Sequence, residues 1–393
     1  MATDGIHPMM LGERGLVLLT VLLLLSLLIT LGLGAVVSVQ NDLRMTANLR
    51  SGTGAAYLAD AGIQWGKQRI TAATIMPPLP ANAIQNSPEG SYSVSFLSSS
   101  QTTPLSATVV LRSVATVKNA TQTIHTRVAK TYDLADAAVV LRGNARSVNF
   151  GGAAFLLSGL DHDLNTGTPM TQSQPRPGIS VGASAVLEQV NGALGTLQRA
   201  NIVGQDATGA TIAVGEGIPQ AEIARIGSEL CTAPHAIVSS LPPSGNLTFS
   251  NELWGTRAIP QLRCITGLPG SGDSVVFTVN TGGAGVLVVR DAELVFTGNF
   301  RWDGWIIVTG SDVGFRVAGP ELKEVLGALI IAESGNATGS GPAMLDIQGS
   351  LRIAFSRQAF TLAAPLLPAA TLNASYSILP SFLRQDYWRS LTP

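Results

Sequence analysis

The most prominent feature of the chain is a long run of hydrophobic residues near its amino end. No charged residue occurs from Gly15 to Asn41, and residues 16–39 are almost continuously apolar. As a helix this run would extend about 36 Å, more than the roughly 30 Å of a bilayer's hydrocarbon core. Soluble core helices rarely run this long without a polar face, and signal peptides usually have a shorter apolar region with a small-residue cleavage site. The pattern predicts a membrane-spanning helix that the mature protein retains.

The apolar periodicity continues beyond the hydrophobic run. A set of small and apolar residues recurs at steps of three and four, which places them on one face of a continuing helix. These residues are Leu43, Ala47, Ser51, Gly54, Leu58, Ala61 and Trp65. We expect one helix that reaches Ile70, with half in lipid and half packed on other structure, and glycines at 52 and 54 favour a bend. The proline-rich residues 76–80 end the helix, because proline lacks the N–H that another turn needs.

Alternating apolar and polar positions follow the helix and predict strands. The predicted strands are Ser91–Leu97, Ala107–Val117 and Thr121–Tyr132. Lys118 and Asn119 lie where a tight turn would join the last two strands. We therefore expect an α+β fold in which the long helix packs on an antiparallel β-sheet. On this interpretation residues 16–39 span the membrane and residues 40–134 form the helix-plus-sheet domain.

After residue 134 the chain consists of short apolar segments separated by Gly, Ser, Thr and Asn. A glycine followed by an apolar segment recurs at intervals of 19, 23 and 22 residues, at Gly285, Gly304, Gly327 and, more weakly, Gly349. Two short strands per turn of about 20 residues are typical of a β-solenoid, and a β-sandwich with coincidental spacing is the alternative. We expect an irregular β-rich region at residues 135–280 and a short β-solenoid at 281–393. Helices are expected at Gln220–Leu230 and Val186–Leu197.

Composition and charge narrow the classes of function. Hydrophobic residues make up 46% of the chain, charged residues 12%, and the net charge is −1. A disordered chain would have low hydrophobicity and high net charge. A nucleic-acid-binding protein would need an excess of basic residues to neutralise phosphates, so we expect no nucleic-acid partner.

Residues near the amino end resemble a known family. Glu13 to Leu18, the apolar run, Asn48 to Arg50 and Tyr57 to Ile63 resemble the amino-terminal segment of PilX-type minor pilins of type IV pili. They are also similar to GspK-type pseudopilins of type II secretion, and the similarity covers about the first 65 residues. It implies that a prepilin peptidase cuts after Gly15, that Leu16 becomes a methylated amino terminus, and that residues 1–15 are a cytoplasmic leader. The charges around the span leave its orientation open by themselves.

The resemblance also implies a function. Major pilins carry a glutamate at the fifth mature position, where this chain has Thr20, so the resemblance favours a minor subunit. We expect a non-enzymatic assembly protein of the inner membrane, with its body in the periplasm, that enters the pilus at or near the tip. Helix packing would involve Thr20, Leu43, Ala47, Leu58, Ala61 and Trp65. The implied partners are other minor pilins, the major pilin, the prepilin peptidase, the inner-membrane assembly platform and a tip adhesin. Alternatives are a GspK-like pseudopilin or a membrane-anchored β-solenoid that binds or processes glycans.

One loop has the oxygen spacing of a calcium site. Asp161, Asp163 and Asn165 place side-chain oxygens at positions 1, 3 and 5 of such a loop. Gly167 comes one place late, and Gln172 stands where an EF-hand has glutamate. A solvated turn is the competing interpretation. Calcium is thus a candidate cofactor at this loop, and no other cofactor is expected.

The remaining polar residues suggest a disulfide and no catalytic centre. Cys231 and Cys264 are the two cysteines of the chain, and an oxidising periplasm would allow them to pair; two buried thiols are the alternative. The histidines and the acidic residues Asp291, Glu293 and Asp303 are scattered. No G-x-S-x-G nucleophile elbow, P-loop or dinucleotide fingerprint accompanies them.

Overall fold

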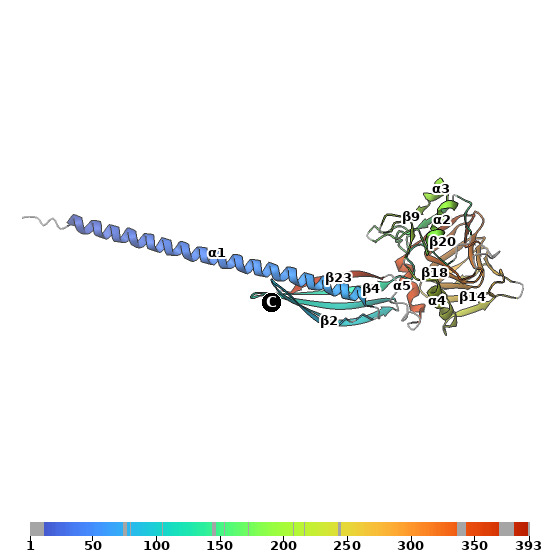
Figure 1. Ribbon diagram of the computed structural model, residues 1–393, viewed down its shortest axis with the longest axis horizontal. Coiled ribbons are helices and arrows are strands. Elements are labelled where there is room, and N and C mark those ends of the chain that lie inside the picture. Colours follow the sequence, from blue (N-terminus) through green and yellow to red (C-terminus); the bar gives the residue numbers. More distant parts are fainter. Residues whose placement is uncertain are drawn as a thin grey trace, which may run out of the picture.

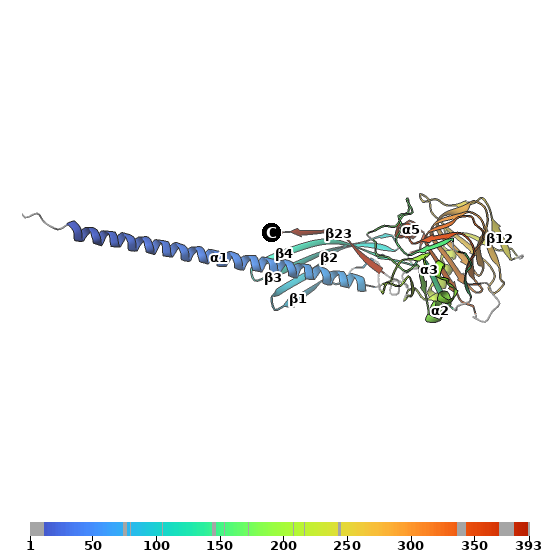
Figure 2. The same cartoon turned by 90° about the horizontal axis from the view of Figure 1, so that it is seen from above.

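The computed structural model has an elongated shape with a helical stalk at one end (Figure 1). It describes residues 12–73, 77–78, 80–103, 105–143, 147–152, 154–171, 173–206, 208–215, 217–242, 245–335, 343–368 and 381–391. Helix α1 (Gly12–Ala72) is 61 residues long and continuous through both glycines at which a bend was expected. Its carboxyl half lies along an antiparallel sheet, and a β-rich body lies beyond its end (Figure 2). The predicted single long helix and the α+β class are therefore confirmed.

The antiparallel sheet combines strands that follow α1 with a strand near the carboxyl end of the described residues. Among the described residues its order is β1-β2-β3-β4-β23. The strands are β1 (Ala83–Ser87), β2 (Gly90–Thr103), β3 (Ser106–Val117), β4 (Ala120–Tyr132) and β23 (Ser381–Leu391). β2, β3 and β4 confirm the three predicted strands, and Lys118 has a φ of 51° in the predicted turn. β23 pairs with β4, so the whole body is an insertion between two neighbouring strands of this sheet.

The body is built on two sheets whose strand pairs are parallel. The larger one has the order β10-β8-β5-β20-β18-β16-β14-β11, and the smaller one has the order β12-β15-β17-β19-β21-β6. The larger sheet contains β5 (Val139–Gly143), β8 (Ile179–Val181), β10 (Ile212–Val214), β11 (Ile237–Ser240), β14 (Gln261–Thr266), β16 (Thr281–Arg290), β18 (Phe300–Gly310) and β20 (Lys323–Glu333), with β7 (Phe155–Ser158), β9 (Ile202–Val203), β13 (Leu253–Trp254) and β22 (Leu351–Ala354) attached beside it. The smaller sheet contains β6 (Val148–Phe150), β12 (Asn246–Phe249), β15 (Ser274–Phe277), β17 (Glu293–Phe296), β19 (Gly314–Val317) and β21 (Leu345–Ile347).

From β14 to β21 the chain alternates between the two sheets, so each short turn adds one strand to each. The order of the turns does not follow the chain throughout. β5 at the start of the body pairs with β20, while β8 and β10 extend the sheet on the far side of β5. The chain then resumes at β11, at the opposite end, and winds back toward β5. A simple solenoid would progress in one direction, so the solenoid class stays a prediction.

The glycine repeat has a clear structural reason. Gly285 pairs with Gly304, and Gly304 pairs with Gly327, at equivalent positions of β16, β18 and β20. Gly304 has a φ of 144°, and a Cβ added there would lie 1.9 Å from the carbonyl oxygen of Gly285. A side chain is therefore excluded by both backbone conformation and space. Gly349 departs from this series, because it precedes β22 and lies against Gly319 instead.

The core of the body lies between the parallel sheets and is rich in aromatic rings. Phe277 and Phe296 on the smaller sheet have ring centroids 5.5 Å apart, and Phe296 stacks on Phe300 of β18 at 3.9 Å. Trp302 and Trp305 are fully buried on the same strand. Rings of this size exclude a large area from water, which is the main source of stability in such a core.

Short helices cover parts of the body. They are α2 (Ser184–Ala193), α3 (Thr196–Arg199), α4 (Gln220–Thr232), α5 (Arg357–Ala363) and the 3-10 helix η1 (Ala364–Leu366). α4 agrees with the helix predicted from Gln220. The helix predicted at 186–197 is divided into α2 and α3, with Leu194 extended between them. α4 buries Ile223, Ile226 and Leu230.

Candidate functional site

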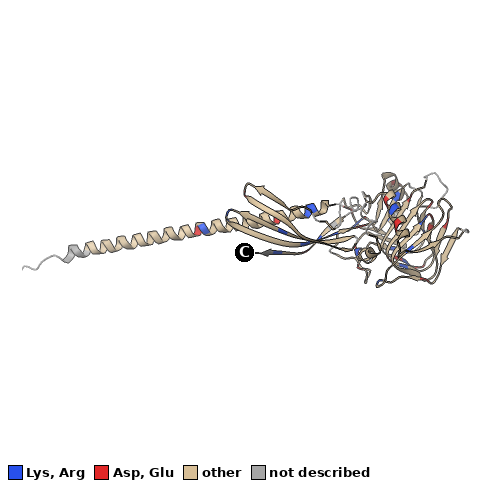
Figure 3. Ribbon diagram, turned by 90° about the horizontal axis from the view of Figure 1, so that it is seen from below, with Lys and Arg blue, Asp and Glu red and all other residues tan. Residues whose placement is uncertain are grey.

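The amino half of α1 is an apolar surface that nothing in the described part of the chain covers. Every side chain from residue 17 to residue 50 is exposed. This part of the helix is long and apolar enough to cross a membrane, and its most apolar stretch has no buried residue. No charged residue occurs from Gly15 to Asn41, and Figure 3 shows the first charges of the described helix only near its middle. An exposed apolar helix of this length is a candidate membrane anchor.

The predicted processing site lies at the start of this surface. Gly15 and Leu16 belong to α1, but their side chains and the whole of residues 1–11 lie outside the described part of the chain. The hydroxyl of Thr20 donates a hydrogen bond to the carbonyl oxygen of Val17 at 2.9 Å. Such a bond within the helix satisfies a hydroxyl in apolar surroundings. Cleavage after Gly15 and a packing role for Thr20 stay predictions.

The carboxyl half of α1 contacts the antiparallel sheet through small residues. Its buried positions are Ala55, Ala59, Gly62, Ile63, Gly66 and Ile70. A Cβ added at Gly62 would lie 2.2 Å from Ser113 Oγ and 2.9 Å from Tyr92 Cδ2. Glycine at this position therefore lets the helix axis approach the sheet closely. The close contact fixes α1 to the sheet and leaves the amino half free.

The contact face differs from the predicted one. Leu58 and Trp65 are half-buried and pack beside the contact, but Ala61 is exposed, as are Leu43 and Ala47. The sheet contact within the chain does not include these last three residues, and their packing against other subunits stays a prediction. The predicted positions follow the apolar period along the helix, whereas the helix face that contacts the sheet includes the alanines and glycines that allow close approach. Leu58 and Trp65 then flank the contact, while Ile63 and Ile70 are buried in it beside the small residues.

A buried lysine holds the end of α1. Lys130 on β4 donates hydrogen bonds to the carbonyl oxygens of Ile70, Thr71 and Ala73, at 2.8, 2.9 and 2.6 Å. The last carbonyls of a helix have no partner within the helix, and they carry partial negative charge that attracts a cation. Burial lowers the pKa of Lys130 to about 8. Sequence reasoning missed this contact, because β4 contains many other polar residues and its pattern does not single out Lys130.

Charged residues connect the sheet to the body. Asp133 follows β4 directly and is 1% exposed; its Oδ2 lies 2.8 Å from Arg176 Nη2 and 3.7 Å from Arg357 Nε. Arg357 at the start of α5 also pairs with Asp161, with Nη1 and Oδ2 3.2 Å apart. Burial raises the pKa of Asp133, and the two guanidinium groups act in the opposite direction. A buried carboxylate needs such partners, so this cluster fixes where the body sits on the sheet.

The loop predicted to bind calcium directs its oxygens toward protein groups. Asp161 faces Arg357, and Asp163 Oδ1 accepts hydrogen bonds from the N–H groups of Asn165 and Thr166 at 2.9 and 2.8 Å. The hydrogen bond from Thr166 and one from Gln358 lower the pKa of Asp163. Asn165 Oδ1 accepts from Arg257 Nη1 at 3.2 Å. No group of three or more His, Cys, Asp or Glu in the described ranges is placed to hold a metal, and calcium at this loop stays a prediction.

A disulfide joins a helix to the larger sheet. Cys231 at the end of α4 is bonded to Cys264 on β14, with their Cα atoms 5.4 Å apart. Both residues are buried. The bond ties α4 to the sheet that it covers.

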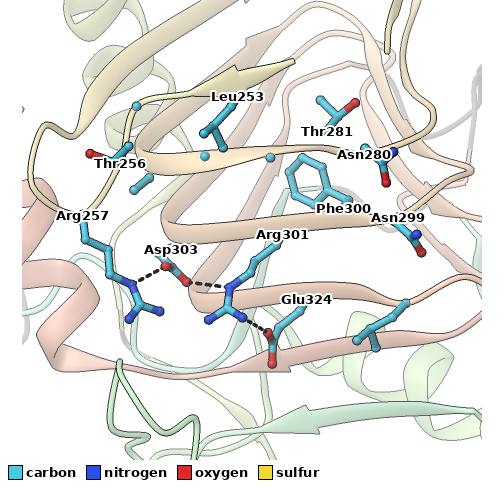
Figure 4. Close-up of a pocket in the computed structure, with 15 residues that line it drawn as sticks. Leu253, Thr256, Arg257, Asn280, Thr281, Asn299, Phe300, Arg301, Asp303 and Glu324 are labelled. Carbon is cyan, nitrogen blue, oxygen red and sulfur yellow. Dashed lines mark hydrogen bonds and ion pairs between the residues drawn. The ribbon is translucent and has the colours of Figure 1, made fainter. Parts of the chain in front are cut away.

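The body also carries an open pocket at the amino ends of three parallel strands (Figure 4). Its volume is about 640 Å³. β16, β18 and β20 supply its floor, and the segment after β13 supplies a wall. Gly282 and Gly283 leave the floor without side chains, and Leu253 and Leu322 are exposed at the edges. A pocket of this size is within the range of small-molecule sites.

Alternating charges line one side of this pocket (Figure 4). Arg257 Nε donates to Asp303 Oδ2 at 2.5 Å, and Arg301 Nε lies 3.6 Å from Asp303 Oδ1. Arg301 also pairs with Glu324 at 3.3 Å, and Glu324 pairs with Arg352 of β22. The row can form because parallel strands place residues from distant parts of the chain side by side.

The acidic residues considered for catalysis occupy separate ion pairs. Asp291 faces Arg290, Glu293 faces Arg316, and Asp303 faces Arg257. Sequence analysis considered Asp303 and missed its partners, since Arg257, Arg301 and Glu324 come from other turns of the chain. The geometry therefore offers a binding pocket with a charged wall.

No protein family matches the sequence, and no curated protein matches it. Among solved structures, the crystal structure of the competence-associated pilin ComZ from Thermus thermophilus aligns with 87% of this chain and 97% of that chain. The sequence identity is 13% and the TM-score is 0.27. An overlap of this extent does not establish a shared fold.

Proposed function

We propose that the protein is a membrane-anchored, pilin-like subunit of type IV pilus machinery, with a structural role in assembly. The observation that carries this proposal is the division of α1 into two halves. The amino half is apolar and uncovered, and the carboxyl half is fixed to a sheet through Ala55, Ala59, Gly62 and Gly66. A helix of this design can reside in a membrane and later exchange lipid for the helices of neighbouring subunits, because both surroundings are apolar.

We propose further that the subunit is a PilX-like minor pilin. Prepilin peptidase would cut after Gly15, and Leu16 would become the methylated amino terminus. The absence of a carboxylate at Thr20 supports a minor subunit, since major pilins use one there. Its partners would be other minor pilins, the major pilin, the assembly platform of the inner membrane and a tip adhesin.

The bulk of the body supports a position at or near the pilus tip. The body is inserted between β4 and β23 and extends beyond the end of α1 (Figure 1). A subunit in the middle of a filament has neighbours above it and below it. A large body beyond the helix is accommodated most easily where no further subunit follows.

Analysis of the mature amino terminus tests the proposal. The protein is purified from membranes of its native host, and its amino terminus and intact mass are determined. We expect a start at a methylated Leu16, and Gly15→Val should abolish cleavage while Gly12→Val, three residues before the cleavage site, leaves it intact. A start at Met1 in the unaltered protein would refute the proposal. Sheared pili that contain the protein would favour the pilus over a type II secretion system.

A further inference from the structure

The pocket on the body combines an unsatisfied buried oxygen with balanced charge. Asp303 lies on β18, and its side chain lines the pocket and is 8% exposed. Its Oδ2 is engaged by Arg257, but its Oδ1 is buried and accepts no hydrogen bond from the described residues. The closest guanidinium nitrogen, Arg301 Nε, lies 3.6 Å away, beyond hydrogen-bond distance. A donor that enters the pocket could satisfy this oxygen.

The charges that line the pocket select against a charged ligand. Arg257 and Arg301 carry two positive charges, and Asp303 and Glu324 carry two negative charges. Each of these groups already has an oppositely charged partner. An anion or a cation would have to compete with an existing pair and would gain little. A neutral ligand can bind without separating any pair.

The remaining lining fits a hydroxyl-rich ring. Asn280 and Asn299 bring side-chain amides to one side of the pocket, opposite the charged row (Figure 4). A hydroxyl group both donates and accepts hydrogen bonds, so one kind of group can donate to Asp303 and accept from an amide. Leu253 and Leu322 are 72% and 60% exposed, and their aliphatic groups can cover the C–H face of a sugar ring. The pocket volume of about 640 Å³ leaves room for the ring.

We propose that this pocket binds an uncharged oligosaccharide. Asp303 accepts a hydrogen bond from a ligand hydroxyl, Asn280 and Asn299 bind further hydroxyls, and Leu253 packs against a ring. This function is additional to assembly and does not depend on cleavage after Gly15. The body would then act as a display domain with a receptor site.

Calorimetry on the full chain in lipid nanodiscs tests the proposal. The neutral probes are cellotetraose, maltotetraose and chitotetraose, and the anionic probe is tetragalacturonate. We expect at least one neutral probe to bind at one site with a dissociation constant below about 1 mM, a typical weak-ligand affinity. Tetragalacturonate should bind at least tenfold more weakly than that neutral probe.

Variants locate the binding site. Asp303→Asn should weaken binding at least tenfold. Because that change could also disturb the Arg257 pair, Leu253→Ala and Asn299→Ala provide an independent test, since both alter exposed side chains. The matched control is Asp346→Asn, a carboxylate on β21 outside the pocket, which should leave binding unchanged.

Three results would overturn the proposal. The first is that no neutral tetrasaccharide binds at 10 mM, a concentration roughly ten times the upper limit expected for the dissociation constant. The second is that binding persists unchanged in both Leu253→Ala and Asn299→Ala. The third is that tetragalacturonate binds as tightly as the neutral probes, since balanced charge would then not govern selection.

Discussion

Replacing Gly62 with alanine tests the contact that fixes α1 to the sheet. An added Cβ would lie 2.2 Å from Ser113 Oγ, 3.2 Å from Ser113 Cβ and 2.9 Å from Tyr92 Cδ2. Contacts this short force the serine to rotate and the ring or the helix to move. At Gly52 of the same helix, by contrast, an added Cβ meets no heavy atom within 4 Å. The two glycines therefore form a matched pair.

The two substitutions should have opposite signs. Alanine is favoured over glycine in a helix by about 0.5–1 kcal/mol, so Gly52→Ala should stabilise the helix by that amount. Overpacking a close contact costs about 1–3 kcal/mol, which exceeds the helix gain at Gly62. We expect Gly62→Ala to lower the free energy of opening of the helix–sheet contact by about 1–2 kcal/mol. The corresponding increase in the open population is roughly five- to thirtyfold.

Hydrogen exchange measures this local opening in the full chain. Amide exchange in residues 55–72, followed by mass spectrometry in nanodiscs, should accelerate in Gly62→Ala and slow in Gly52→Ala. Ser113→Ala removes the closest atom, and Ser113 Oγ is buried without a hydrogen-bond partner among the described residues, so this change alone should cost little. The double variant Gly62→Ala, Ser113→Ala should recover part of the lost protection. If Gly62→Ala slows exchange as Gly52→Ala does, close approach does not limit packing at this position.

Three further predictions concern the lysine, the disulfide and the glycine repeat. Lys130→Met leaves the last carbonyls of α1 without a donor and should destabilise the sheet unit by about 1–3 kcal/mol in thermal melts. Burial lowers the pKa of Lys130 to about 8, below the pKa of a lysine in the unfolded chain, so the unfolded state binds more protons than the folded state above pH 8. The stability of the unaltered protein should therefore rise from pH 8 toward about 10. A rise of equal size in Lys130→Met would contradict this assignment. Reduction of the bond between Cys231 and Cys264 should add two hydrogen atoms to the intact mass and lower stability by about 3–4 kcal/mol for a separation of 33 residues. Two thiols that alkylate without reductant would refute the pairing. Gly304→Ala should destabilise the body by more than about 2 kcal/mol, because the φ of 144° and the carbonyl oxygen of Gly285, 1.9 Å from an added Cβ, both exclude a side chain. Gly192→Ala in α2 should be neutral or stabilising in the same thermal melt.

Local patterns predicted most of the elements near the amino end. The predicted helix from Leu16 to Ile70 lies within α1, because hydrophobicity and period are properties of neighbouring residues. The same applies to β2, β3 and β4, whose alternating side chains face the helix on one side only. The glycine repeat likewise identified positions that pair in register in β16, β18 and β20.

Contacts between distant residues decided the sites. Lys130 and Ile70 are 60 positions apart, and Asp161 and Arg357 are 196 positions apart. No short pattern contains both members of such a pair. The pocket is a similar case, because Arg257, Asp303 and Glu324 come from different turns of the body and only parallel stacking brings them together. Sequence analysis accordingly considered Asp303 alone.

The sequence by itself determined that the chain has an uncharged apolar helix, a helix-plus-sheet unit and a β-rich body with recurring glycines. Each of these follows from composition and period, which act over a few residues. The tertiary structure decided which face of α1 meets the sheet, that β23 returns to β4, and that the body turns back so that β5 meets β20. These outcomes depend on how closely backbones can approach and on which buried polar groups find partners. Both conditions are set only when segments far apart in the chain come into contact.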